Sequence, residues 1–195
     1  SDNVIRYCNI KGANSGSSGA IISFETSIDV AGNNNNTIEY CNITNSGSRP
    51  TIALLSAGTA GKENTGNIIS NNNFYDFFSS SESYTSFGIF ISSNSSDWTI
   101  SGNSFYETTD FSPIVNNYFY AIRISTGNNH IVSNNYIGGK SPQCGGGPMS
   151  INLNATTSST FYGIYLSVGA TTASSIQNNV IKNINLTTAV TNTLP

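Results

Sequence analysis

One six-residue pattern recurs along the whole chain and constrains the fold more than any other feature. It reads hydrophobic, two mostly polar or small residues, Asn or Cys, any residue, hydrophobic. The copies are IRYCNI (5–10), IEYCNI (38–43), ISNNNF (69–74), ISGNSF (100–105), VSNNYI (132–137) and IQNNVI (176–181). Successive copies start 33, 31, 31, 32 and 44 residues apart, and the last interval contains a Gly-rich insertion. One such unit cannot bury its own apolar side, so the repeat predicts a solenoid of stacked units.

A second pattern with nearly the same period lies between these copies: AIIS (20–23), ALLS (53–56), IFIS (89–92), IRIS (122–125) and IYLS (164–167). Each unit therefore has at least two short strands of alternating residues, separated by Gly, Asn and Ser turns and without an amphipathic helix. We predict an all-β fold: a right-handed, single-stranded parallel β-helix of about six coils of 31 to 33 residues.

The domain organisation follows from the same repeat. Residues 1–195 are expected to form a single β-helix domain, and the Gly- and Pro-containing segment 138–160 a long loop insertion. Neither end contains an amphipathic helix that could cap an open coil. The chain is therefore interpreted as an internal segment of a longer solenoid, or as a solenoid whose ends are covered by a partner.

The fourth position of the first pattern predicts a column inside the stack. Asn side chains in neighbouring coils can hydrogen-bond along the axis, and Cys can fill the same position as a small hydrophobic residue. The predicted ladder consists of Cys8, Cys41, Asn72, Asn103, Asn135 and Asn179.

With these N-x-I-x-x-[N/C]-x-[I/F] units and this ladder, nearly the whole chain resembles the pectate-lyase-like family of parallel β-helices. The resemblance implies the fold. It implies no single activity, because the family includes polysaccharide lyases, glycoside hydrolases, phage tailspikes and bacterial adhesins. The Asn-, Ser- and Thr-rich composition is similar to that of large secreted or surface proteins of bacteria.

The outward position of the second pattern predicts a mostly apolar stripe, which ought to be covered on a monomer. The chain's own loops, a neighbouring domain or subunit, or a stacked carbohydrate could cover it, and these alternatives stay open. The stripe residues are Ile21, Leu54, Phe90, Arg123 and Tyr165.

Asp76 and Glu107 are the best candidates for chemistry. They end the related segments FYD and FYE of successive coils, so their backbones should lie about 5 Å apart. Two acids at that separation can share a proton, hold Ca²⁺ or form a retaining glycosidase pair. Alternatively, each acid caps its own turn. Lys and Arg are expected to be absent from the positions neighbouring this pair, which disfavours a lyase.

The remaining signals argue against catalysis. The chain has no G-H-G motif, and it has R-I-S at 123–125 where polygalacturonase-like enzymes have R-I-K. His130, the one histidine, is expected to be a solvated turn residue in GNNH. No catalytic residue is assigned beyond the weak candidates Asp76 and Glu107, and no cofactor beyond Ca²⁺ at that pair.

Charge and hydropathy limit the partners. A net charge of −3 and a pI near 4.9 argue against nucleic acid, which requires a basic surface. No apolar run approaches the roughly 20 residues of a membrane span. The expected partners are neighbouring coils or domains of the same protein, with polysaccharide as an open alternative.

We therefore expect a non-catalytic structural or adhesive module of a secreted or cell-surface bacterial protein, with carbohydrate contact left open. A polysaccharide lyase or glycoside hydrolase of the β-helix class is the first alternative. A phage tailspike segment, with the stripe as a subunit interface, is the second.

Overall fold

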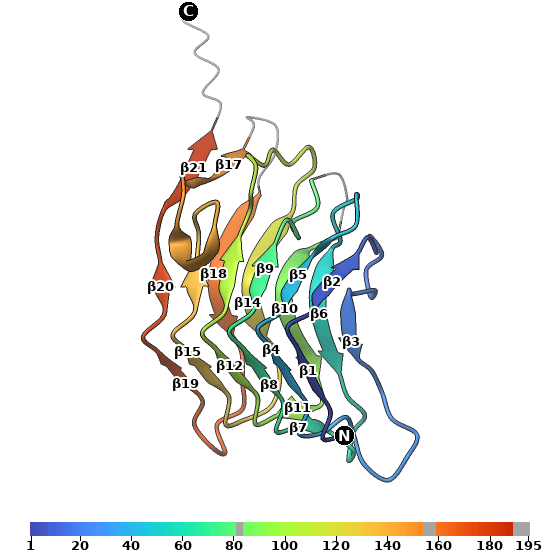
Figure 1. The fold of residues 1–195 in the computed structure, drawn as a ribbon. Helices are drawn as coiled ribbons and strands as arrows, with labels where there is room; N and C mark the ends of the chain where they lie inside the picture. The colour runs from blue at the N-terminus through green and yellow to red at the C-terminus, as the bar shows by residue number, and fades with distance from the viewer. Residues whose placement is uncertain (81–83, 154–158, 189–195) are drawn as a thin grey trace, which may run out of the picture.

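The structure is a computed structural model that describes residues 1–80, 84–153 and 159–188. Its parallel strands stack into a β-solenoid of about five turns, close to the predicted six (Figure 1). Within the described residues the only helical element is the 3-10 turn η1, Pro142–Cys144. The predicted all-β parallel solenoid is thus confirmed.

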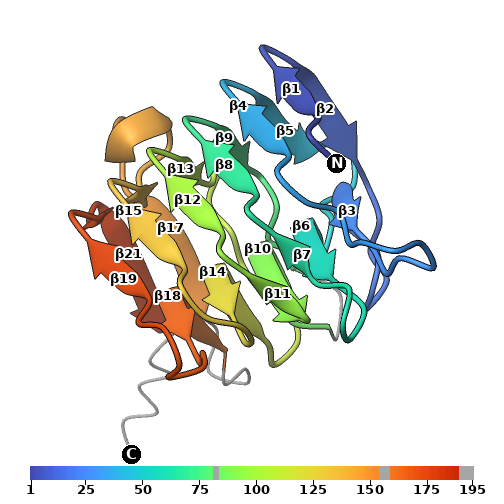
Figure 2. The same cartoon turned by 90° about the horizontal axis from the view of Figure 1, so that it is seen from below.

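Three parallel sheets run along the solenoid (Figure 2). The first contains β1 (Val4–Arg6), β4 (Thr37–Glu39), β8 (Ile68–Ser70), β12 (Thr99–Ser101), β15 (Ile131–Ser133) and β19 (Ser175–Gln177). The second contains β2 (Asn9–Gly12), β5 (Asn42–Asn45), β9 (Asn73–Tyr75), β13 (Ser104–Tyr106), β16 (Tyr136–Ile137) and β20 (Val180–Ile181). The third contains β3 (Ile22–Phe24), β6 (Ile52–Ala57), β10 (Ser86–Ser93), β14 (Tyr118–Ile124) and β18 (Thr160–Leu166).

Two pairs of strands extend this pattern. They are β7 (Asn64–Thr65) with β11 (Ser95–Ser96), and β17 (Met149–Leu153) with β21 (Ile184–Thr188). Segment 138–160 is therefore not a loop throughout, because it contains η1 and β17. Alternation explains the strand: Met149 and Ile151 are buried, and a bridge joins Ile151 to Phe111. Residues 154–158 of this segment lie outside the described part.

The register of the first sheet follows the repeat. Ile5, Ile38, Ile69, Ile100, Val132 and Ile176 pair from coil to coil. The side chains of the middle coils are buried and form the core with inward residues of the other two sheets. Aromatic rings stack there in the same way: the centroids of Phe74 and Phe105 lie 5.0 Å apart.

The bend between the first and second sheets has the same backbone conformation in six successive coils. The residue before each ladder position has φ between 54° and 67°, a left-handed conformation that Asn and Gly tolerate best. These residues are Tyr7, Tyr40, Asn71, Gly102, Asn134 and Asn178. The bend turns the following Asn or Cys inward, which explains why the pattern contains this residue at a fixed place.

The third sheet corrects the predicted stripe in its first two coils, by two residues in the first coil (Ile21 to Ser23) and by one in the second (Leu54 to Leu55). Leu54 pairs with Ile22 and Ile89 in the inward column, and it is fully buried. Ile21 precedes Ile22 and is not in the outward column either. That column consists of Ser23, Leu55, Phe90, Arg123 and Tyr165.

Ser56 is the reason for the shift. Its side chain faces inward and forms hydrogen bonds with Ser95 Oγ (2.9 Å) and Asn64 Nδ2 (3.1 Å). The serines of the later copies instead come one residue after the inward residue, so they face outward. The register between β6 and β10 also shifts between Ile91 and Ser93. Serine was therefore the wrong residue for aligning these strands, and apolar alternation was the right one.

Candidate functional site

The structure places the six predicted ladder residues in one column of side chains with a single direction. Asn103 Oδ1 accepts hydrogen bonds from the backbone N–H and the Nδ2 of Asn72, both at 3.0 Å. Its own Nδ2 donates to the Ile69 carbonyl at 2.8 Å and to Asn135 Oδ1 at 3.0 Å. The same pattern continues through Asn135 to Asn179. Every polar atom of the Asn103 amide therefore has a protein partner, and the ladder is structural.

The two cysteines continue the column with weaker bonds. The Cys41 N–H donates to Asn72 Oδ1 at 2.9 Å, and the Cys8 N–H lies 3.4 Å from Cys41 Sγ. Both residues are free thiols, Cys8 exposed and Cys41 buried. Burial raises the pKa of the Cys41 thiol. These thiols stack along the axis and form no disulfide.

A second interior column escaped prediction and corrects the placement of His130. Its members are Asn3, Asn36, Asn67, Trp98 and His130, spaced by 33, 31, 31 and 32 residues. His130 is fully buried, not solvated: Nδ1 accepts the Trp98 N–H at 3.4 Å and Nε2 bonds the Thr126 carbonyl at 2.9 Å. Burial lowers the pKa of this imidazole below 6.5. The equal spacing was the signal that could have revealed the column.

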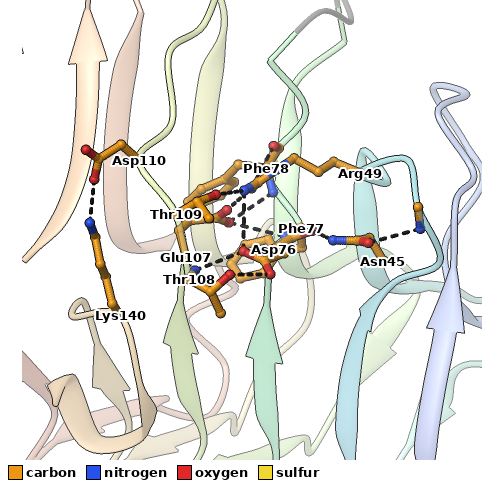
Figure 3. A network of polar contacts seen from close by, with 11 residues as sticks. Asn45, Arg49, Asp76, Phe77, Phe78, Glu107, Thr108, Thr109, Asp110 and Lys140 are labelled. Atoms are coloured by element: carbon orange, nitrogen blue, oxygen red, sulfur yellow. Dashed lines mark hydrogen bonds and ion pairs between the residues drawn. The ribbon is translucent and has the colours of Figure 1, made fainter. Parts of the chain in front are cut away.

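Glu107 lies at the centre of a polar network on three successive coils (Figure 3). Its side chain is fully buried, and Oε1 accepts the backbone N–H groups of Phe77 and Phe78, both at 3.2 Å. Oε2 contacts Arg49 Nη1 and has no other polar partner within the described residues. The carboxylate is therefore held by the chain and closed to solvent.

Asp76 performs a similar role nearer the surface. Its Oδ1 accepts from the Thr108 N–H at 2.9 Å and lies 3.3 Å from Arg49 Nη2, and Oδ2 accepts from Thr108 Oγ1 at 2.7 Å. Both carboxylates thus fasten the loops that follow β9 and β13. The prediction that each acid caps its own turn was wrong in detail: Glu107 caps the loop after Asp76, and Asp76 caps the loop after Glu107.

Arg49 is the residue of this network that sequence reasoning missed. It follows β5 in the preceding coil, lies between both carboxylates, and places its guanidinium 5.7 Å from the Phe111 ring centroid. Burial lowers its pKa, and the charge of Asp76 opposes that shift. The expectation that no Arg is close was wrong, because adjacency in a solenoid runs between coils and not along the sequence.

This network offers little to a metal ion or a substrate. Among the residues that the structure describes, no three His, Cys, Asp or Glu side chains lie close enough together to hold a metal ion. Arg49 neutralises one of the two negative charges, and hydrogen bonds from the chain occupy most of the carboxylate oxygens. The arrangement stabilises loops.

The outer side of the third sheet has a different chemistry. Six rings form one surface, here called the aromatic face: Phe87, Phe90, Tyr118, Tyr120, Tyr162 and Tyr165. Phe87, Tyr120 and Tyr162 stack from coil to coil, with centroids 5.4 and 4.7 Å apart. Tyr165 stands at 78° to both Tyr120 and Tyr162.

Exposure divides the aromatic face into a base and a top. Phe87 and Tyr120 are only 6% and 7% exposed, whereas Tyr165 and Tyr118 are 37% and 50% exposed. Of the five residues of the predicted stripe, only Phe90, Arg123 and Tyr165 lie on this outer side of the sheet. The base rings are buried against one another and against Ile52 and Leu55 of the same sheet, whereas two tyrosines remain open.

Arg123 projects into the aromatic face. Its guanidinium carbon lies 5.0 Å from the centroid of Tyr120 and 5.3 to 5.8 Å from those of Tyr165, Phe90 and Phe87. Its Nε donates to Ser125 Oγ at 3.0 Å. Burial raises the pKa of the Tyr120 hydroxyl, and the charge of Arg123 opposes that rise.

The stacked sheets and the interior amide column place the chain in the class of parallel β-solenoid proteins. No protein-family model, curated protein or solved structure matches the chain. In the described ranges, no helix has the length and apolar character to span a membrane.

Proposed function

We propose that this chain is a non-catalytic adhesive module of a secreted or cell-surface bacterial protein, related to the pectate-lyase-like β-helices, and that it contacts polysaccharide through the aromatic face. The observation that carries this proposal is the open pair Tyr118 and Tyr165 on a base of buried rings. Aromatic side chains with a buried body and an exposed polar end are favoured at interfaces.

The geometry of the open rings supports a sugar ligand. Rings that stack along the axis cover one another's faces, so they present mainly edges. Tyr165 is turned across this stack, and its hydroxyl can also form hydrogen bonds. A flat ring beside a hydroxyl suits a sugar, which has apolar C–H groups and hydroxyls.

The rigidity of the scaffold also supports binding without catalysis. Binding surfaces on regular elements lose less conformational entropy on association than surfaces on loops. Here every ring of the aromatic face belongs to β10, β14 or β18. The surface is therefore ordered before a ligand arrives.

The enzyme alternative has less support from the acids. A general acid or nucleophile must reach the glycosidic bond. Glu107 is fully buried, and the carboxylate of Asp76 is bonded to Thr108 and Arg49. A polymer chain cannot reach Glu107 unless the loops after β9 and β13 open, and a pair of acids needs both members.

A glycan array of plant, bacterial and animal polysaccharides tests the proposal on the complete 195-residue chain. We expect binding that weakens roughly tenfold in the double variant Tyr118→Ala/Tyr165→Ala, as is usual for interface aromatic anchors. The matched control is Tyr7→Ala/Tyr40→Ala, which removes another exposed pair of stacked tyrosines. Absence of any bound glycan, equal loss in both double variants, or release of reducing sugar would overturn the proposal.

A further inference from the structure

We infer that the polysaccharide bound on the aromatic face is acidic, and that Arg123 pairs with its carboxylate or sulfate group. This inference rests on the proposed function, because it specifies the ligand class of the same site.

Arg123 is a cation that has no counter-ion within the part of the chain that the structure describes. The ion pairs within the described residues join Arg6 to Glu39, Arg49 to Asp76 and Glu107, and Lys140 to Asp110. Arg123 takes part in none of them, although the chain carries more acidic than basic residues. Among the described residues of this acidic protein, the Arg123 guanidinium on this surface is thus not neutralised.

The position of the guanidinium is fixed before binding. Ser125 holds Nε, and four ring centroids lie within 5.8 Å of the guanidinium carbon. Neither Nη group has a hydrogen-bond partner within the described residues. Glu107 Oε2 is the only side-chain polar atom there that is both buried and without such a partner, so both Nη groups must reach solvent. Arg123 therefore presents its two Nη groups outward from an ordered support.

The neighbours of Arg123 on the sheet leave its charge uncompensated. The outward column at its level contains Ser23, Leu55, Phe90 and Tyr165, and none of them is charged. Arg binds carboxylate and sulfate-like groups through two parallel hydrogen bonds, and aromatic surroundings reduce competition from water. The surface therefore fits a ligand that has apolar ring faces and a negative group.

A neutral glycan would fit less well. When bound to the exposed tyrosines, it would cover Arg123 and remove water from the guanidinium N–H groups. These groups would then lack a charged acceptor. Desolvation of a charge without a partner is unfavourable. The same arginine therefore favours acidic glycans and disfavours neutral ones.

The test compares polymers that differ only in charge. The probes are dextran, carboxymethyl dextran and dextran sulfate, together with the hydroxyethyl, carboxymethyl and sulfate forms of cellulose. Affinity electrophoresis of the complete chain gives the dissociation constant for each polymer. Arg123→Gln removes the charge, Arg123→Lys keeps it, and Arg6→Gln is the matched control on the first sheet.

We expect wild type to bind one or both charged forms at least about tenfold more tightly than the neutral form, since ionised hydrogen bonds are worth roughly this factor. Arg123→Gln should abolish that preference, Arg123→Lys should keep part of it, and Arg6→Gln should leave it unchanged. The carboxymethyl and sulfate probes show which anion is preferred.

Three results would overturn the inference. Equal binding of neutral and charged polymers, unaffected by Arg123→Gln but lost in Tyr118→Ala/Tyr165→Ala, would refute the acidic ligand and keep the proposed function. Equal losses in Arg123→Gln and Arg6→Gln would show non-specific attraction to charge. Failure of wild type to bind any of these polymers or any glycan of the array would overturn both proposals.

Discussion

Arg49 and Arg123 have opposite surroundings in the same solenoid. Arg49 is enclosed by Asp76, Glu107 and Thr109 and contacts the ring of Phe111. Arg123 contacts four rings and meets no carboxylate within the described residues. The first arginine satisfies groups that the fold has already buried, whereas the Nη groups of the second have no hydrogen-bond partner within the described residues.

The comparison teaches that partners, more than burial, separate structural from functional polar groups here. Interior groups such as the Asn ladder and the Arg49 network use their donors and acceptors within the protein. On the aromatic face, the backbone is equally regular, yet donors remain open. Four predictions test this distinction.

Arg49→Met should have the largest effect. It leaves the fully buried Glu107 carboxylate without its cation, and removal of one partner from a buried pair costs about 3 to 5 kcal/mol of unfolding free energy. Urea denaturation measures the change. Arg49→Met/Glu107→Gln should recover part of the loss, and a shift under about 1 kcal/mol in the single variant would contradict a closed network.

Asn103→Leu should cause the next largest loss of stability. The substitution leaves the buried Asn72 N–H without a partner, at about 1 to 3 kcal/mol, and removes one of the hydrogen bonds to the Ile69 carbonyl. Asn9→Ala is the control, since Asn9 belongs to an exposed row of amides on the second sheet and should change stability by less than about 1 kcal/mol. Similar losses in both variants would show that interior and exterior amides do not differ.

His130 predicts a smaller effect that depends on pH. Burial lowers its folded-state pKa, so the unfolded chain takes up a proton first as the pH falls below 6.5. Stability from neutral His130 is complete above that pH and declines toward the lower, folded-state pKa. Thermal unfolding at pH 7.5, 6.5 and 5.5 should show this decline.

His130→Asn is the control for the pH experiment. It inserts the amide that Asn36 and Asn67 contribute to the same column, and it has no group that titrates in this range. The decline between pH 7.5 and 5.5 should become shallower in the variant. An identical pH dependence in both proteins would mean that carboxylates cause it and that His130 contributes nothing.

Arg123→Met should have the smallest effect on stability and so completes the contrast with Arg49→Met. The methionine keeps contact with the rings, and a partly exposed cation–π contact contributes about 0.5 to 1 kcal/mol. Urea denaturation beside Arg49→Met measures the difference. A loss as large as that of Arg49→Met would show that Arg123 is a structural residue.

The sequence predicted those parts of the fold that repeat. Period and alternation were sufficient for the parallel solenoid, the inward column of the first sheet, and the ladder from Cys8 to Asn179. They also predicted the stacking of Asp76 near Glu107, because successive coils keep their register.

The missed features have physical reasons. Arg49 lies in a turn that has no counterpart in the other coils, so the repeat does not predict its position. Only the stacking of the coils brings it to Glu107. Leu54 was assigned outward because Ser56 was matched to the outward serines of later coils. His130 was assigned to solvent from its polar GNNH context, although its spacing from Asn67 and Trp98 follows the repeat. Where a polar side chain points inward, the polarity of its sequence neighbours gave a wrong prediction of its exposure.

The single direction of the Asn ladder has a consequence for synthesis of the chain. Each inner N–H group at the bend is bonded by an Asn that lies 31 to 44 residues later in the sequence. A ribosome adds that length in roughly 2 to 9 seconds, at rates of about 5 to 20 residues per second. The interior hydrogen bonds of each newly made coil are therefore completed only after the next coil has been synthesised. The coils thus become ordered one after another along the solenoid.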